Sequence, residues 1–552
     1  MKQPAFSKIL AFIITNLILT QLVYPKPPQL TIIFIVDQFA YNYIDKVKPH
    51  LTGGINDLLK NGMFYKNMYM PHCHPATGSG HVTISTGVTP NVHGVVGNAF
   101  SLSNGQKNYY EKFKYGAIVN SVFSPDGLYK HGVSAKNIMV DNISDQFALQ
   151  ERPGQKCQVF AVSHKSRASV GCAGKLGKAV WFDKKGRQFT SSKAYFDQLP
   201  DWIINFNRQY MPKKNPKNLE WKLFFPKSKK PYNFKDVDDY SFATHPFKMI
   251  GTDFSKITNI QENEYGEIYI KSPHANQHLL DLSKECLEAN LTKNQNDRFL
   301  LWISLSPLDA LGHYYGPQSK EVLDMIYHLD WQMKKFMQYV STKVSPNKTL
   351  YILASDHGIM PIPELLQKQG LKNVHRINDK EIVDSLNKYI EKKHEIANVM
   401  SYFLNANFYL NKKVFYALSP EKRRQVATSI KAFLKKQPGI REIWTFDELK
   451  NLQIESGTID SFFKNQIYKG RSGDFICKCH PYSVITKHRR GTSHRSPYEY
   501  DTHVPLVIYQ RGKYASKTFE QKVFMTQLAN TLAKIFNIQK PSASTENVLP
   551  GF

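Results

Sequence analysis

Cysteines and acidic residues are scarce in this chain. Six cysteines are spread over 552 residues, so a disulfide framework of the kind that holds small secreted domains together is excluded, although one or two disulfides are plausible. Asp and Glu number 45 against 73 Lys and Arg, and the formal net charge is +28. Because the basic residues lie in scattered short clusters, we expect solvated basic faces and no nucleic-acid partner.

Long apolar runs are also missing, except at the N-terminus. Residues 9–24 are mostly apolar, follow Lys2 and Lys8, and end at the proline-rich stretch 25–28. The segment is short and polar for a membrane span, so we expect residues 1–25 to be a signal peptide, with a retained anchor as the alternative. The rest, residues 28–552, is therefore expected to be soluble, exported to the periplasm or secreted, and without a stable membrane partner.

Potential metal ligands follow three apolar runs that are typical of buried strands. The runs occupy residues 31–36, 299–305 and 350–354. The side chains that follow them are Asp37, then Asp309 and His313, then Asp356 and His357. In an open α/β sheet the carboxyl ends of the strands form the ligand crevice, so carboxylates and imidazoles gathered there indicate a metal site.

The number of these ligands favours a pair of zinc ions. Zn²⁺ binds nitrogen and oxygen ligands, and two ions about 4 Å apart can hold both the attacking and the leaving oxygen of a phosphoryl transfer. Two such sites need about six protein ligands and a nucleophile. Five ligands lie at strand ends, and one histidine near the C-terminus completes the set. We therefore expect two Zn²⁺ ions per chain.

Thr77 is the candidate nucleophile. It lies in a segment rich in proline, histidine and glycine that leads into 82–87, where a helix can begin. We therefore expect Thr77 on a turn just before a helix N-terminus, where backbone N–H groups and the helix dipole favour an anion. This is a suitable place for a group that attacks phosphorus.

Short motifs throughout the chain resemble those of the alkaline phosphatase superfamily, in the branch shared by nucleotide pyrophosphatase/phosphodiesterases and PafA-type single-threonine alkaline phosphatases. The motifs occur in the family's order and are Val36-Asp37-Gln38, Thr77-Gly-Ser-Gly-His81, Ser85-Thr86-Gly87, His93-Gly94, Gly97-Asn98, Asp309-Ala-Leu-Gly-His313, Ser355-Asp356-His357-Gly358 and Gly491-Thr-Ser-His494. The resemblance implies an α/β fold, an α/β/α sandwich with capping insertions. We place these insertions at about 185–295 and 365–470.

The resemblance also implies a division of the ligands between the two zinc ions. One ion is expected to be held by Asp309, His313 and His494, and the other by Asp37, Asp356, His357 and the Thr77 oxygen. His494 is preferred to His503 because it ends the Gly-Thr-Ser-His motif. One departure is notable, since Arg495 stands where the family usually has glycine; this cation alters the local loop or contacts phosphate.

Three polar residues indicate a monoester substrate. In PafA-type monoesterases an asparagine and a Lys-x-Arg pair hold the charged oxygens of a phosphate monoester, and Asn98, Lys165 and Arg167 match them here. A guanidinium fork can bond two oxygens of a monoester dianion, which favours monoesters over diesters. The resemblance thus implies an alkaline phosphatase for small-molecule phosphate esters that forms a phosphothreonine at Thr77.

Other functions stay open at this point. A phosphodiesterase or nucleotide pyrophosphatase on the same fold is the nearest alternative, and a non-catalytic surface-binding protein is suggested only by the basic charge. A sulfatase is a further possibility because Cys73-His-Pro75 is similar to the start of the sulfatase signature. However, Thr77 replaces the arginine of that signature, and we expect Cys73 to be structural. The oligomeric state and the physiological phosphoester are left open.

Overall fold

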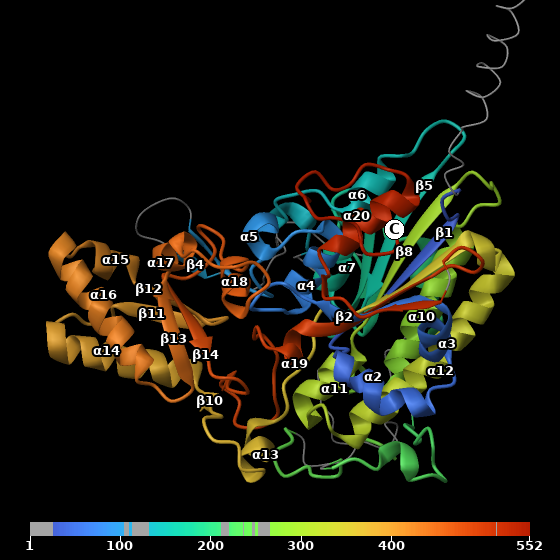
Figure 1. Ribbon diagram of the computed structural model, residues 1–552. Coiled ribbons are helices and arrows are strands. Elements are labelled where there is room, and N and C mark those ends of the chain that lie inside the picture. Colours follow the sequence, from blue (N-terminus) through green and yellow to red (C-terminus); the bar gives the residue numbers. More distant parts are fainter. Residues whose placement is uncertain are drawn as a thin grey trace, which may run out of the picture.

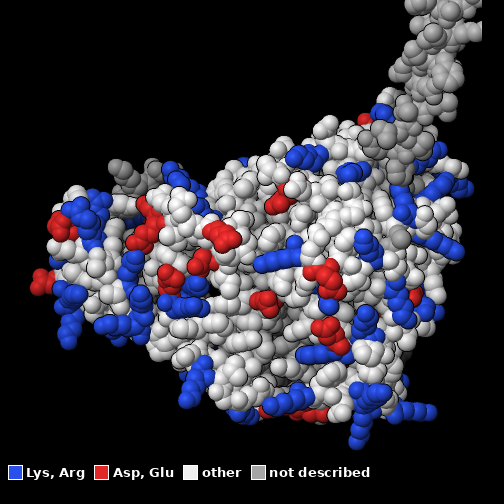
Figure 2. Space-filling model, in the orientation of Figure 1, with Lys and Arg blue, Asp and Glu red and all other residues white. Residues whose placement is uncertain are grey.

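The computed structural model describes residues 26–103, 110–112, 132–210, 220–235, 237–244, 249–251, 265–514 and 516–552. The predicted signal peptide lies outside the described residues. Among the helices in the described ranges, none is long and apolar enough to cross a membrane. All six cysteines are free thiols, so the expected disulfides do not form. Lys and Arg side chains are spread over the face drawn in Figure 2 and do not form one large patch.

A sheet of ten strands runs through the centre of the molecule (Figure 1). The order across the sheet is β17 (Lys517–Phe519), β2 (Met63–Tyr69), β16 (His503–Tyr509), β9 (Thr349–Ala354), β1 (Leu30–Val36), β8 (Arg298–Leu305), β5 (Cys157–Ser163), β6 (Lys178–Asp183) and β7 (Gln188–Thr190), and β18 (Val523–Phe524) pairs with β2. Strands β9, β1, β8, β5 and β6 are parallel, whereas β16 and β7 run antiparallel to their neighbours. The three predicted strands, β1, β8 and β9, are direct neighbours.

Helices cover both faces of this sheet because its central strands are apolar on both sides. Along β1, Ile32 and Phe34 contribute to one core cluster, whereas Ile33 and Ile35 contribute to another. The helices on the first face are α2 (Tyr41–Val47), α3 (Gly54–Asn61), α8 (Asp201–Tyr210), α10 (Pro273–Asn290), α11 (Pro307–Tyr315) and α12 (Lys320–Lys343). Those on the second face are α4 (Thr77–Thr86), α6 (Ile143–Ala148), α7 (Ser166–Ala173) and α20 (Gln527–Phe536). The result is an α/β/α sandwich.

A second, smaller sheet lies beside the sandwich (Figure 1). Its strand order is β11 (Met400–Leu404), β12 (Asn407–Leu410), β14 (Phe475–Cys479) and β13 (Ile440–Thr445). Helices α14 (Asp379–His394) and α16 (Pro420–Lys435) pack on it through a separate core cluster. A short parallel pair, β10 (Arg376–Ile377) with β15 (Val484–Ile485), connects this unit to the large sheet.

The shorter helices are α5 (Pro90–His93), α9 (Tyr265–Tyr269), α13 (Pro363–Lys368), α15 (Lys412–Tyr416), α17 (Phe446–Asn451), α18 (Ile459–Lys464) and α19 (Glu499–Thr502), and β3 (Ser101–Ser103) pairs with β4 (Tyr110–Lys112).

The second sheet falls largely within the interval 365–470 that we predict to be an insertion. The interval 185–295 begins at β7 and ends after α10, both of which belong to the central sandwich. The two insertion boundaries remain predictions.

Candidate active site

The expected carboxylates meet where three adjacent parallel strands end. Asp37 directly follows β1, Asp309 lies in the first turn of α11 after β8, and Asp356 follows β9. The Asp37 and Asp356 side chains are fully buried, and that of Asp309 is 7% exposed. Burying three acidic groups together is unfavourable unless cations or hydrogen bonds compensate their charge.

The pKa values of these carboxyl groups reflect the competition between burial and the neighbouring charges. Burial and, after it, the neighbouring Asp356 carboxylate raise the pKa of Asp37 to about 6, although Lys165 acts to lower it. Burial also acts to raise the pKa of Asp356, but His357 and His81 outweigh it and hold this pKa at about 2. Negative charge therefore stays in the buried cluster, which is a favourable setting for a divalent cation.

Lys165 is the cation that directly contacts two of the carboxylates. Its Nζ lies 2.6 Å from Asp37 Oδ2 and 2.5 Å from Asp309 Oδ2. Burial alone acts to lower the pKa of Lys165, but Asp309 and Asp37 raise it above its usual value. The ammonium group therefore stays charged although its side chain is only 11% exposed.

The three expected histidines share one orientation. Each Nδ1 is hydrogen-bonded to a backbone carbonyl: His313 to Thr492 at 2.9 Å, His357 to Gly358 at 2.9 Å and His494 to Pro75 at 2.8 Å. Each Nε2 faces a carboxylate: His313 faces Asp309 at 3.2 Å, His357 faces Asp37 at 3.4 Å and His494 faces Asp309 at 3.8 Å. A proton held at Nδ1 by a carbonyl leaves Nε2 free as a metal ligand, as in known metal sites.

These side chains fit a metal centre. Asp309, His357 and His494 form one group whose ligand atoms lie within 4.8 Å of one another, and Asp37, Asp356 and His357 form another. Three buried atoms of these groups have no hydrogen-bond partner among the described residues, namely Asp37 Oδ1, Asp356 Oδ2 and His357 Nε2. Unpartnered carboxylate and imidazole atoms that face one another are what a bound cation requires. His357 belongs to both groups, so the predicted division of ligands between two ions stays a prediction.

Thr77 lies beside this centre, but its local structure differs from our expectation. It is the first residue of α4, with Ala76 as the N-cap, and does not lie on a turn before a helix that starts near residue 82. The helix begins early because Gly80 N–H already bonds to the Ala76 carbonyl, at 2.7 Å. The Thr77 side chain is buried, and its Oγ1 lies 3.3 Å from Lys165 Nζ.

Asn98 is held next to the same helix N-terminus. The Gly78 N–H donates to Asn98 Oδ1 at 2.7 Å, and the Asn98 Nδ2 hydrogens have no acceptor among the residues that the structure describes. On the next residue, the Ala99 carbonyl accepts from Asn405 Nδ2 at 2.6 Å. Asn98 is therefore held by the start of α4, and its neighbour Ala99 is held by Asn405 in the turn between β11 and β12.

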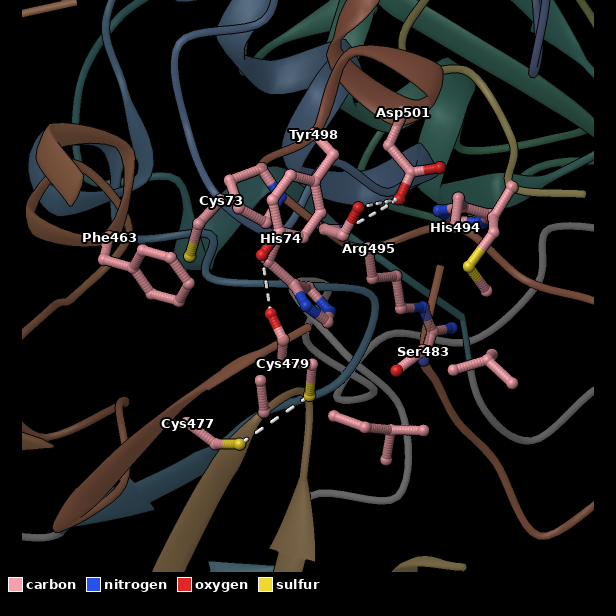
Figure 3. Close-up of a pocket in the computed structure, with 16 residues that line it drawn as sticks. Cys73, His74, Phe463, Cys477, Cys479, Ser483, His494, Arg495, Tyr498 and Asp501 are labelled. Atoms are coloured by element: carbon pink, nitrogen blue, oxygen red, sulfur yellow. Dashed lines mark hydrogen bonds between the residues drawn. The ribbon is translucent and has the colours of Figure 1, made fainter. Parts of the chain in front are cut away.

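Two guanidinium groups complete the surroundings. Arg167 is in the first turn of α7, and its Nε is buried without a hydrogen-bond partner among the described residues. Arg495, directly after His494, lies between that histidine and Ser483 (Figure 3). Burial lowers the pKa of Arg495, and the charge of Arg167 lowers it further, so the two cations are close enough to repel. Such repulsion favours binding of an anion between them.

Residues that sequence reasoning did not assign to the site also support it. Gln38 donates from Nε2 to Asp309 Oδ1 at 2.7 Å and from its backbone N–H to Asp356 Oδ1 at 3.2 Å. It adopts a positive φ of 72°, which is unusual for a side chain of this size. His81 lies 3.2 Å from Asp356 Oδ2 through Nδ1. Its place four residues after Thr77 in one helix is the signal that could have identified it.

Cys73 belongs to a small apolar cluster with Phe462 and Phe463. In Figure 3 its side chain points toward Phe463, on the other side of the pocket from His494. Burial raises the pKa of the Cys73 thiol well above its usual range, which disfavours the thiolate. In the same pocket Cys477 Sγ and Cys479 Sγ are 3.7 Å apart, too far for a disulfide bond.

Comparisons with known proteins identify the family and the fold. The type I phosphodiesterase / nucleotide pyrophosphatase family matches residues 31–504. The alkaline phosphatase PhoV of Synechococcus elongatus is 27% identical over 95% of this chain and 92% of its own, and the alkaline phosphatase PafA of Elizabethkingia meningoseptica is 26% identical over 94% and 93%. The crystal structure of alkaline phosphatase PafA superposes with a TM-score of 0.77 and 23% identity, covering 95% of this chain and 98% of that one. The expected fold is thereby confirmed.

Proposed function

Because the chain belongs to the type I phosphodiesterase / nucleotide pyrophosphatase family, we propose that it is a zinc-dependent phosphate monoester hydrolase, an alkaline phosphatase acting on small-molecule phosphate esters. The observation that carries the proposal is the position of Lys165 Nζ, which touches Thr77 Oγ1 and two carboxylates of the candidate metal centre at once. Nucleophile, cation and metal ligands thus share one small, buried space.

Thr77 is the proposed nucleophile. Its Oγ1 would attack phosphorus in line and release its proton to solvent as the new P–O bond forms, while the bond to the leaving oxygen breaks and that oxygen takes up a proton from solvent. Water would then hydrolyse the phosphothreonine and release phosphate. Because Thr77 begins α4, the partial positive charge of the helix N-terminus lies where negative charge accumulates.

Asn98, Lys165 and Arg167 would stabilise the transferred phosphoryl group. Asn98 has Nδ2 hydrogens free to donate, and Lys165 and Arg167 carry positive charge. Such preorganised donors act most strongly on the charge that develops in the transition state.

The metal centre would be a pair of Zn²⁺ ions. Bound zinc would supply Lewis-acid stabilisation of the attacking and leaving oxygens. The residues proposed to hold it are Asp37, Thr77, Asp309, His313, Asp356, His357 and His494. Their support is the shared Nδ1 anchoring of the histidines and the unpartnered atoms of the buried cluster.

We propose a monoester substrate because Lys165 and Arg167 supply more positive charge than the single negative charge of a diester requires. A monoester dianion has three non-bridging oxygens, and a diester has two with a single negative charge. Lys165, Arg167 and Asn98 together match the monoester. The name of the matching family keeps a phosphodiesterase as the alternative function. Export to the periplasm or the medium is part of the proposal and rests on the apolar N-terminal segment at 9–24.

The test compares a monoester with a diester before and after removal of metal. We expect p-nitrophenyl phosphate to be hydrolysed much faster than bis(p-nitrophenyl) phosphate, chelation to abolish the activity and Zn²⁺ to restore it. Replacing Lys165 and Arg167 by Ala should lower monoester turnover by about 100-fold or more and diester turnover far less. Lys175→Ala with Arg208→Ala, which removes the same charges from exposed positions, is the control.

Faster hydrolysis of the diester would replace the monoesterase by a phosphodiesterase. Equal losses on both substrates would show that Lys165 and Arg167 do not recognise the monoester. Full activity after verified removal of metal would refute the zinc mechanism.

A further inference from the structure

A basic pocket lies beside the metal centre. It has a volume of about 470 Å³, large enough for a sugar phosphate or a nucleotide. Its charged and metal-binding lining residues are His313, Arg376, Lys487, His488, Arg490 and Arg495. Asp379 is the carboxylate in this lining, and its Oδ1 accepts the backbone N–H of Lys380 at the start of α14. The described lining is therefore strongly positive, and we call it the basic pocket.

The backbone of the loop that carries these cations is fixed. Arg376 donates to the carbonyls of His488 and Gly491, at 3.1 and 2.9 Å. Arg376 is itself held by a two-pronged ion pair with Glu364, at 2.8 and 2.7 Å. The charge of Arg376 is therefore compensated, and its function is to position the loop.

The same loop is attached to the candidate metal ligand His313. Thr492 donates its N–H to the His313 carbonyl at 3.0 Å, and His313 Nδ1 bonds to the Thr492 carbonyl at 2.9 Å. Gly491 adopts a φ of 71°, and a Cβ there would lie 2.3 Å from the His313 carbonyl oxygen. Only glycine permits this close contact, so the loop is held at a defined distance from the centre.

Two cations of the pocket are available for a ligand. Lys487 and Arg490 are exposed, and neither has an ion-pair partner among the described residues. Like charges placed on one short, fixed loop repel one another, and an anion bound between them would relieve that repulsion. Arg495 adds a third positive charge at the wall closest to the centre.

The basic pocket lies on the open side of the centre. The His313 side chain is 29% exposed, whereas the other five carboxylate and imidazole side chains are between 0 and 7% exposed. Lys165 Nζ, which lies 3.3 Å from Thr77 Oγ1, contacts Asp309 at Oδ2, whereas His313 faces Oδ1. An in-line attack by Thr77 expels the leaving group away from Thr77, toward the side on which His313 is exposed.

We propose that the basic pocket binds a second phosphate group carried by the leaving group, so that bisphosphorylated small molecules are preferred over monoesters with an uncharged leaving group. The proposal rests on the proposed monoesterase function and adds a substrate class to it. Lys487 and Arg490 would bind the second phosphate while the first is transferred to Thr77.

Glucose 6-phosphate and glucose 1,6-bisphosphate form a matched pair of substrates for the test. The wild type should have the higher kcat/KM on the bisphosphate. Lys487→Gln with Arg490→Gln should lower kcat/KM for the bisphosphate about tenfold, mainly through KM, because partly exposed ion pairs are individually weak. The loss for glucose 6-phosphate should be less than about twofold, and high salt should reduce the difference between the substrates.

The control is Lys435→Gln with Lys436→Gln, an equal change of charge at exposed positions ending α16. It should alter neither substrate's kcat/KM. Equal losses on both substrates with the Lys487 and Arg490 variant, or no loss at all, would overturn the proposal. Binding of glucose 1,6-bisphosphate by isothermal titration gives a second measurement. If the wild type hydrolysed neither sugar phosphate, the proposed function would fail, and equal affinity of wild type and variant would then refute the basic pocket as well.

Discussion

Asn98 offers a sharp test of how the site treats the phosphoryl group. The Gly78 N–H donates to Asn98 Oδ1 at 2.7 Å, so the amide is oriented by the residue next to Thr77, the proposed nucleophile. Under the proposed function its Nδ2 group donates to an oxygen of the transferred phosphoryl group. We expect Asn98→Ala to lower kcat/KM for p-nitrophenyl phosphate by about 100- to 1,000-fold, the effect of removing one preorganised donor to a developing anion.

The structural cost of the same change should be small. Asn98→Ala removes one acceptor from the Gly78 N–H, and an ordinary hydrogen bond contributes about 0.5–1.5 kcal/mol to stability. The site residue is only half-buried, so water can replace the lost acceptor. The thermal unfolding midpoint should therefore change by no more than a few degrees, which separates a catalytic loss from unfolding.

Two further variants make the Asn98 test decisive. Asn98→Asp keeps an oxygen for the Gly78 N–H but replaces the donor by a negative charge, so its loss should exceed that of Asn98→Ala. Asn91→Ala, an exposed position in the preceding helix, should change activity less than about twofold. A loss below about fivefold for a well-folded Asn98→Ala protein would show that the amide does not contact the phosphoryl group.

Three other changes test separate parts of the structure. Thr77→Ala should abolish turnover while metal stays bound, and Thr77→Ser should keep appreciable activity. Cys73→Ala should spare the chemical step. Activity that is retained in Thr77→Ala but lost in Cys73→Ala would point to a sulfatase-like site. Gly80→Ala would place a Cβ 2.5 Å from the Asp356 carbonyl oxygen. We therefore expect this variant to be destabilised by about 1–3 kcal/mol and to bind less metal. A fully active and equally stable variant would contradict this packing. Asp330→Ala should lower the free energy of unfolding, measured with denaturant, by about 2–4 kcal/mol, because the Asp330 carboxylate accepts three backbone N–H groups at the start of α3. A loss under about 1 kcal/mol would refute this role.

The strand ends could be predicted because parallel strands that are buried on both faces have a recognisable sequence pattern, a continuous apolar run. The runs at 31–36, 299–305 and 350–354 are apolar without alternation, and each becomes a fully buried strand. Helices α12 and α16 also have local signals in the sequence: apolar side chains recur at helical spacing along α12, and Ser419 caps α16 by accepting the Lys422 N–H.

The start of α4 and the supporting contacts could not be predicted in this way. Proline, histidine and glycine around Thr77 are typical of a loop, but packing of Gly80 against Asp356 allows the helix to begin there. Asn405 contacts the carbonyl of a residue 306 positions away, and no local pattern indicates such a contact. Tertiary packing, and not the neighbouring sequence, determines which residues make supporting contacts of this kind.

The carboxylates of the centre have a second consequence beyond metal binding. A buried lysine tends to lose its proton, yet Asp309 and Asp37 raise the pKa of Lys165 and keep its ammonium group charged. The side chains proposed to hold zinc therefore also maintain the charge that is proposed to bind phosphate. The proposed metal binding and phosphate binding thus share one electrostatic network, in which Asp37 and Asp309 face Lys165 through Oδ2 and the imidazoles of the candidate centre through Oδ1. Effects of substitutions at Asp309 and Lys165 should accordingly not be additive, because each removes the partner on which the other depends.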